Sequence, residues 1–103
     1  MDKAIAAYHE VIRIEPEDAV AYNNLGNALK TKGDLDGAID AYQHAVRINP
    51  EFANAYCNLG SALDDKGDLD GAIDAYQHAV RIIPEDAIAR NIRPRGLGWG
   101  HRC

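Results

Sequence analysis

The sequence predicts an all-α fold built from stacked helix pairs, and three observations support that prediction. The sixteen residues GDLDGAIDAYQHAVRI occur at positions 33–48 and recur unchanged at 67–82. Pro16, Pro50 and Pro84 are separated by the same thirty-four residues, a period typical of helical repeat arrays. Hydrophobic residues make up 47% of the 103-residue chain and aromatic residues only 7%, a balance that suits closely packed helices.

The period divides the chain into two full repeats with an incomplete repeat at either side. Residues 1–18 are expected to form the second helix of an incomplete first repeat, because Ala4, Ile5 and Tyr8 fall in register with later apolar residues. Residues 19–52 and 53–86 are the full repeats and are identical at 27 of 34 positions. Residues 87–93 begin a further repeat that is truncated. Residues 94–103 are expected to be a disordered or a non-native tail, because Pro94 would end the helix.

The first half of each full repeat is predicted to be an amphipathic helix. Its apolar stripe follows the spacing i, i+3, i+4, i+7 and consists of Tyr22, Leu25, Gly26 and Leu29 in one copy. Gly33 is expected to end this helix, because glycine readily takes the left-handed conformation found just past a helix C-terminus. Gly26 and Gly60 lie inside the helices at a cost of about 1 kcal/mol relative to alanine, which predicts close approach to another helix.

The second half of each repeat is predicted to be a helix antiparallel to the first. Either Asp34 or Asp36 is expected to cap its N-terminus, where a carboxylate accepts hydrogen bonds from free N–H groups. Its apolar stripe consists of Ala38, Ile39, Tyr42, Ala45 and Val46. Pro50 stops the helix because proline has no N–H. One such hairpin cannot bury both of its faces, so the copies must stack.

Composition and charge narrow the classes of partner. Residues 1–86 hold seven basic and sixteen acidic residues, a formal charge of −9, whereas residues 87–103 hold four arginines and no acid. An acidic body argues against nucleic acid or an anionic membrane as the main partner. The N-terminus has no signal-peptide pattern, and two distant cysteines, Cys57 and Cys103, are not the dense framework of a secreted mini-domain, which favours a cytoplasmic location.

The repeated positions resemble the signature of the tetratricopeptide repeat family. In the first copy these positions are Tyr22, Leu25, Gly26, Leu29, Ala38, Tyr42, Ala45 and Pro50. In the second they are Tyr56, Leu59, Gly60, Leu63, Ala72, Tyr76, Ala79 and Pro84. The family pattern usually has Trp at the position of Tyr22, Tyr at that of Leu29 and Glu at that of Gly37. The Asn-Leu-Gly runs at 24–26 and 58–60 are also similar to arrays of the O-linked N-acetylglucosamine transferase type.

This resemblance implies a right-handed α-solenoid of about two and a half repeats, with a concave groove lined by the first helix of each repeat. Domains of this kind bind peptides or protein segments and are not enzymes by themselves. The resemblance therefore implies a non-catalytic protein–protein interaction module, with no cofactor.

The differences between the two full repeats indicate where such a groove lies. Five of the seven differences fall on the first helix, on one face roughly opposite the apolar stripe, whereas the second helices do not differ between residues 33 and 48. Drift on a solvated surface would explain this, but exposed positions of the second helix, such as Gln43, do not drift. The groove residues expected in the two repeats are Val20, Asn23, Asn24, Asn27, Lys30, Thr31, Asn54, Cys57, Asn58, Ser61, Asp64 and Asp65.

This lining predicts an extended protein or peptide segment as the partner. Asparagine amides both donate and accept hydrogen bonds, so they hold a peptide backbone irrespective of its side chains. Lys30 is expected to make one end of the groove positive, and Asp64 and Asp65 the other end negative, so that basic residues of the segment lie opposite the two aspartates.

Other chemistry finds little support in the sequence. His9, His44 and His78 lack ligand spacing for a metal and are expected to be solvated surface residues. No histidine lies beside Cys57 on its helix to activate the thiol, so no catalytic residue and no metal site are expected.

The incomplete ends favour a second interpretation. Arrays need about three repeats for stability and usually have polar capping helices. The chain is therefore expected either to be part of a longer array or to self-associate into a homo-oligomer through its bare ends. The residues expected at those ends are Ile5, Tyr8, Ile12, Ile88 and Ile92. In that alternative the protein is a structural, assembling fragment with no separate ligand.

Overall fold

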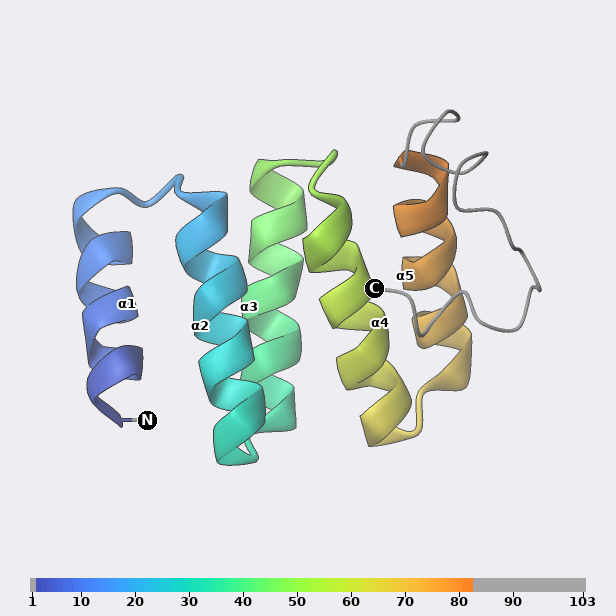
Figure 1. Ribbon diagram of the computed structural model, residues 1–103, viewed down its shortest axis with the longest axis horizontal. Helices are drawn as coiled ribbons and strands as arrows, with labels where there is room; N and C mark the ends of the chain where they lie inside the picture. The colour runs from blue at the N-terminus through green and yellow to red at the C-terminus, as the bar shows by residue number, and fades with distance from the viewer. Residues whose placement is uncertain (1, 83–103) are drawn as a thin grey trace, which may run out of the picture.

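The computed structural model describes residues 2–82 and contains only helices in that range. The five helices are α1 (Asp2–Ile14), α2 (Ala19–Lys32), α3 (Leu35–Ile48), α4 (Ala53–Lys66) and α5 (Leu69–Ile82). They stand in one row, each packed against its neighbour in the chain (Figure 1). The predicted all-α fold of stacked helix pairs is therefore confirmed. The expected repeat start at 87–93 and the tail at 94–103 lie outside the described residues.

The turns inside the helix pairs use glycine in the left-handed conformation. Gly33 has φ 100° and Gly67 has φ 98°, values that L-residues with a side chain rarely adopt. The N–H of Gly33 donates to the carbonyl of Lys30, and the N–H of Asp34 reaches back to Leu29, which closes the end of α2. The prediction that Gly33 ends the first helix is confirmed.

The N-terminal caps decide between the two aspartates left open by the sequence. The Asp34 carboxylate accepts a hydrogen bond of 2.9 Å from the Gly37 N–H, so Asp34 is the cap of α3. A Cβ added to Gly37 would lie 2.5 Å from that carboxylate, which explains glycine at a position where the family often has glutamate. Helix α4 has no side-chain cap, because Phe52 stands where Asp18 caps α2.

The core forms between consecutive helix pairs rather than inside each pair alone. Its largest fully buried side chain is Tyr42, on α3, which is 0% exposed. One buried cluster joins α3, α4 and α5 and consists of Ala38, Tyr42, Leu59, Ala62 and Ala75. A smaller cluster joins α2, α3 and α4 and consists of Ala19, Ala45 and Ala55.

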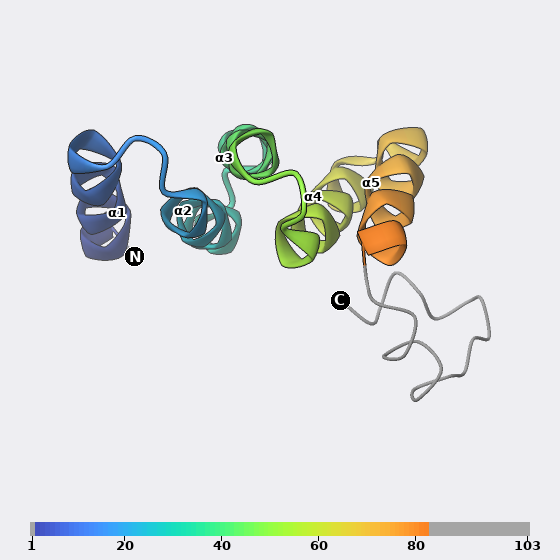
Figure 2. The same ribbon diagram turned by 90° about the horizontal axis from the view of Figure 1, so that it is seen from above.

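The small residues at the helix contacts are required by the tyrosines opposite them. A Cβ added to Gly26 would lie 2.5 Å from Tyr42 Cε1, and one added to Gly60 would lie 2.7 Å from Tyr76 Cε1. The predicted reason for glycine inside these helices, close approach of another helix, is therefore confirmed. The approach places α2 and α4 on one side of the molecule and α3 on the other (Figure 2).

Candidate functional site: the surface of α2 and α4

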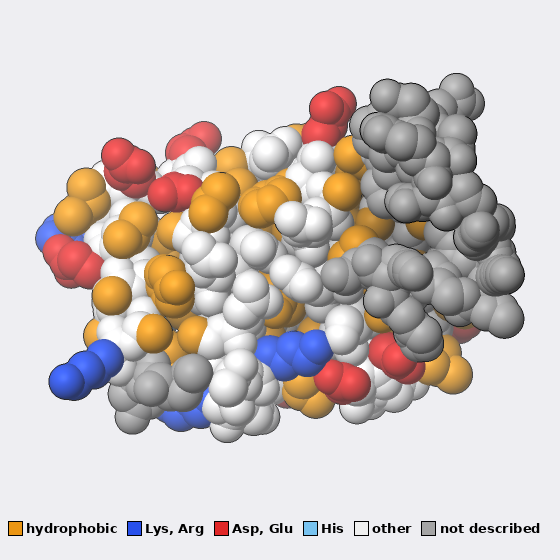
Figure 3. All heavy atoms as spheres, viewed as in Figure 1, with side chains coloured by type: hydrophobic (Ala, Val, Ile, Leu, Met, Phe, Trp, Pro, Cys, Tyr) orange, Lys and Arg blue, Asp and Glu red, His pale blue; other side chains and the backbone are white. Residues whose placement is uncertain are grey.

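The first helices of the two full repeats, α2 and α4, present a mostly uncharged polar surface. Seen in the orientation of Figure 1, this face carries mainly uncharged polar side chains and backbone, with one basic patch beside acidic ones (Figure 3). Of the twelve expected groove residues, the structure leaves six exposed: Val20, Asn27, Thr31, Asn54, Asp64 and Asp65. Four are half-buried: Asn24, Lys30, Asn58 and Ser61. The surface is therefore only partly open to a ligand.

Two of the expected groove residues are buried instead. Asn23 is 8% exposed and Cys57 is 4% exposed, so neither offers an open side chain to a ligand. The amide of Asn58 donates a hydrogen bond of 2.9 Å to the Asn23 carbonyl oxygen, which satisfies the one buried polar side chain of the described core. The sequence assigned both asparagines to ligand binding, but this pair joins α2 to α4.

The charged groups are also paired across the two helices. The ammonium group of Lys30 donates a hydrogen bond of 2.7 Å to the Ser61 hydroxyl and lies 3.5 Å from a carboxylate oxygen of Asp65. The expected separation into a positive end and a negative end is therefore wrong. Helix packing brings Lys30 of one repeat beside the acids of the next, because the two helices run side by side.

Asn27 has a structural bond as well as an exposed surface. The hydroxyl of the buried Tyr42 donates a hydrogen bond of 2.5 Å to the Asn27 side-chain oxygen. Burial raises the pKa of Tyr42 from 10 to about 12, because the phenolate would lose its hydration. Asn27 therefore anchors the largest core residue from the polar face, and little of its acceptor capacity is left for a ligand.

Three polar side chains are left for recognition. Within residues 2–82, the side chains of Asn24, Asn54 and Asp64 make no hydrogen bond or ion pair. Burial raises the pKa of the Tyr76 hydroxyl, and the negative charges of Asp64 and Asp65 raise it further. This effect shows that both carboxylates act on the same corner of α4 and α5, where a cation would be attracted.

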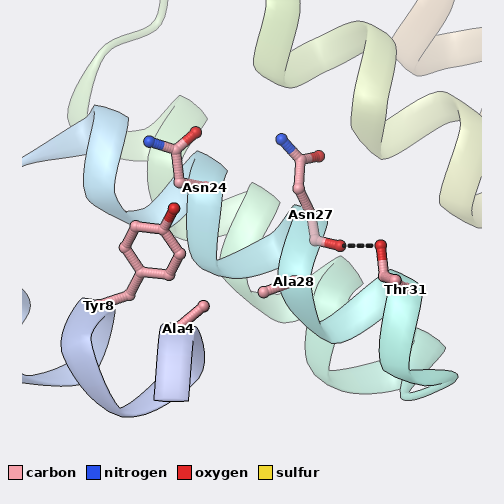
Figure 4. A pocket seen from close by; sticks show the side chains of 6 residues that line it. All are labelled: Ala4, Tyr8, Asn24, Asn27, Ala28 and Thr31. Atoms are coloured by element: carbon pink, nitrogen blue, oxygen red, sulfur yellow. Dashed lines mark hydrogen bonds between the residues drawn. The ribbon is translucent and has the colours of Figure 1, made fainter. Parts of the chain in front are cut away.

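A hollow lies at the N-terminal edge of this surface, between α1 and α2. It has a volume of about 260 Å³ and is lined by Ala4, Tyr8, Asn24, Asn27, Ala28 and Thr31. Figure 4 shows Ala4 and Tyr8 of α1 on one side of it and the four α2 residues on the other, with the Thr31 hydroxyl bonded to the Asn27 carbonyl. The sequence expected Tyr8 at a bare end but gave no indication of a hollow.

The histidines expected to be solvated are partly covered by aromatic rings. The His44 ring stacks on Tyr22 with centroids 5.0 Å apart, and His78 stacks on Tyr56 at 4.9 Å. The expectation was wrong for His44 and His78, which are half-buried, whereas His9 is exposed. The repetition of both members of the pair at the same spacing was the available signal. In the described part of the chain no three acidic, histidine or cysteine side chains gather as a metal site.

The expected self-association residues are only partly visible. Ile5, Tyr8 and Ile12 of α1 are half-buried, and Ile88 and Ile92 lie outside the described residues. Larger apolar exposure occurs elsewhere, at Ile14, Leu69 and Ile73. None of the helices in residues 2–82 has the length and apolar character to span a membrane.

Comparisons with known proteins agree on one kind of repeat. A family model described as TPR repeat matches residues 1–33 and 26–67, and one described as Tetratricopeptide repeat matches residues 53–86. A search of curated proteins found no match.

Two solved structures share the fold. The crystal structure of MamA superposes with a TM-score of 0.75 at 32% identity, covering 84% of this chain and 49% of that one. A second crystal structure of MamA protein gives a TM-score of 0.72, also at 32% identity, with 84% and 46% covered. The chain therefore spans about half the length of the solved structures it matches.

Proposed function

The chain belongs to the tetratricopeptide repeat family, and on that premise we propose that it binds an extended peptide or protein segment along α2 and α4. Repeats of this family form protein–protein interaction modules and are typically non-catalytic. The proposal adds the place of binding and the nature of the segment. The observation that carries it is that α2 and α4 lie side by side with polar faces on the same side of the molecule (Figures 2 and 3).

The contacts within this surface suit it to holding a backbone. The Asn23–Asn58 and Lys30–Ser61 hydrogen bonds fix α2 relative to α4, so the surface is organised before a ligand arrives and loses little freedom on binding. Asn24 and Asn54 then offer amides that both donate and accept. The asparagine-rich face is similar to the arrays of O-linked N-acetylglucosamine transferases, and we extend that likeness to backbone recognition.

The charge of the surface indicates which segments are preferred. Asp64 makes no ion pair within residues 2–82, whereas Asp65 is already beside Lys30. A Lys or Arg of the segment opposite Asp64 gains an exposed ion pair worth about 0.2–1 kcal/mol, so the preference for basic residues is modest and falls with salt. The acidic body also disfavours nucleic acid and anionic membranes as partners, in keeping with a cytoplasmic role.

The test selects binders and then asks where they bind. Short unstructured peptides are selected from a displayed library against the chain, and their affinities are measured by fluorescence anisotropy. The double variant Asn54→Ala/Asp64→Ala removes one amide and one charge from α4 without breaking a bond within residues 2–82. Its matched control, Asp40→Ala/Gln43→Ala, removes the same groups from the exposed face of α3.

We expect the α4 variant to weaken binding about tenfold, the equivalent of about 1.4 kcal/mol, and the α3 variant to change it less than about twofold. Equal losses in both variants would move the site away from α2 and α4. A library that yields no binder would remove the proposal. Asn27 and Asn58 are unsuitable positions for this test, because they hold Tyr42 and Asn23 in place.

A second candidate function, assembly with copies of itself, is favoured by exposed aliphatic residues on the helices. Ile73 is 54% exposed, although its counterpart one repeat earlier, Ile39, is packed against the core. Covering such residues in a homo-oligomer would gain hydrophobic free energy. Sedimentation velocity at micromolar concentrations tests this candidate, and a sedimentation coefficient that does not change with concentration would exclude it.

A further inference from the structure

The hollow between α1 and α2 has an exact counterpart one repeat later, where it is filled. Its six lining residues lie thirty-four positions before Ala38, Tyr42, Asn58, Ser61, Ala62 and Asp65. Ala38, Tyr42 and Ala62 of that later set are each 0% exposed. In the hollow, the corresponding Ala4 and Tyr8 remain half-buried. The same set of residues is thus covered at one place in the chain and open at the other.

Helix α2 is what covers the later set. Gly26 lies against the ring of Tyr42, so closely that a Cβ would be 2.5 Å from it. Asn23 accepts the hydrogen bond from Asn58, and Lys30 donates to Ser61. The cover therefore consists of one helix that presents an acceptor, a glycine and a donor at positions i, i+3 and i+7.

The open hollow offers the same partners to a helix in the equivalent place. Tyr8 presents a ring to a small residue, Asn24 corresponds to the donor Asn58, and Asn27 corresponds to the acceptor Ser61. One feature differs: the carboxylate of Asp65 is replaced by the neutral hydroxyl of Thr31. A neutral donor such as Gln or Asn therefore suffices where α2 has Lys30.

We propose that this hollow is a docking site for an amphipathic α-helix of a partner polypeptide. The helix lies across α1 and α2 as α2 lies across α3 and α4. It places glycine against Tyr8, an amide or carboxylate oxygen beside Asn24, and a donor beside Asn27 and Thr31. This site is separate from the extended-segment site, since it uses α1 and does not need Asn54 or Asp64.

The chain itself is a poor source of this helix. The glycines of α2 and α4 in a second copy are already covered by Tyr42 and Tyr76, so either helix would have to leave its own core to dock. The sequence that begins the next repeat has Pro94 at the glycine position, and proline there ends a helix. A partner helix is therefore the committed occupant.

The first test uses α2 itself as the probe. A synthetic peptide of residues 17–34, which includes the cap Asp18 and the terminal Gly33, is titrated into the full chain and followed by NMR. We expect saturable shifts at Tyr8, Asn24 and Ala28. The matched peptide carries Gly26→Leu, which cannot approach the Tyr8 ring, and should bind about tenfold more weakly.

The chain offers a matched pair of variants on α1. Ala4→Arg places a long side chain in the hollow, whereas Ala7→Arg adds the same group to an exposed position of the same helix. Only the first should abolish the shifts. Shifts confined to α4 and α5, or equal binding of the two peptides, would overturn the proposal. A wild-type chain that dimerises and loses the dimer with Ala4→Arg would make a second copy the occupant, and would also overturn it.

Short helical peptides are marginal in water, so a second measurement removes the dependence on peptide affinity. Residues 17–34 fused directly before Met1 keep the thirty-four-residue register, since Met1 corresponds to Leu35. The fusion should raise the midpoint of thermal unfolding, and the fusion carrying Leu at the position of Gly26 should not. Equal midpoints for the two fusions would exclude a glycine-dependent seat at Tyr8.

Discussion

The ring of Tyr42 lies directly against the backbone of Gly26, leaving no room for a methyl group. A Cβ at Gly26 would be 2.5 Å from Tyr42 Cε1 and 2.9 Å from Cζ. Tyr42 is fully buried, and its hydroxyl reaches Asn27 on the next residue of the same helix. One tyrosine thus fixes the distance between α2 and α3 and also ties the core to the polar surface.

Gly26→Ala is expected to destabilise the chain although alanine favours helix formation. Overpacking against Tyr42 costs about 1–3 kcal/mol, which exceeds the gain of up to about 1 kcal/mol in helix propensity. Urea denaturation followed by circular dichroism measures the difference. Gly60→Ala is the matched control. Its neighbour Tyr76 is only half-buried and has room to move, so the loss should be smaller. A loss at Gly60 equal to that at Gly26 would contradict the explanation.

Tyr42→Phe should change how stability depends on alkaline pH. The folded-state pKa of Tyr42 is about 12, above its ordinary value of 10, because the buried ring disfavours the phenolate. The unfolded chain therefore releases this proton first. Stability is fully present below pH 10 and falls as pH rises towards 12, by at most about 3 kcal/mol at about 1.4 kcal/mol per pKa unit.

The measurement is thermal unfolding of both proteins between pH 8 and pH 12, with neutral pH as reference. The variant should lose the component of the decline that comes from Tyr42, at a cost at neutral pH of about 1 kcal/mol for the missing hydrogen bond. Parallel curves for the two proteins across the whole range would show that Tyr42 titrates normally.

Asn58→Ala is expected to destabilise the contact between the two full repeats. The substitution leaves the carbonyl oxygen of the buried Asn23 without its donor, at a cost of about 1–3 kcal/mol. Asn54→Ala on the same helix removes an exposed amide and should change stability by less than about 0.5 kcal/mol. A double-mutant cycle with Asn23→Ala isolates the pair, and a coupling energy near zero would show that the hydrogen bond contributes nothing.

Lys30→Met should weaken the same contact more than Lys66→Met does. Lys30 is held by both Ser61 and Asp65, whereas Lys66 meets Asp36 in a more exposed pair. We expect a loss of up to about 1 kcal/mol for Lys30 and close to none for Lys66. The measurement is urea denaturation at low and at molar salt, where screening shortens to about 3 Å and should reduce the Lys30 effect. An effect of Lys66 as large as that of Lys30 would contradict this ranking.

The periodic residues determined the fold at the level of the sequence. Gly33 ends α2 and the apolar stripes face inward for reasons that lie within about one turn of helix, so local pattern was sufficient. Gly26 could be recognised as a contact point because a glycine inside a helix has a cost that only packing explains. The choice of Asp34 over Asp36 as the cap needed backbone geometry that the two residues share too closely in sequence to separate.

The tertiary structure decided what the polar residues of α2 and α4 do. The sequence showed that Asn23, Asn58 and Lys30 lie on one helical face, but not that α4 lies close enough to α2 to pair them. Hydrogen bonds between residues more than thirty positions apart depend on the angle between stacked repeats, which no single repeat encodes. The hollow at Tyr8 has the same origin, because it exists only where a covering helix is not supplied by the described chain.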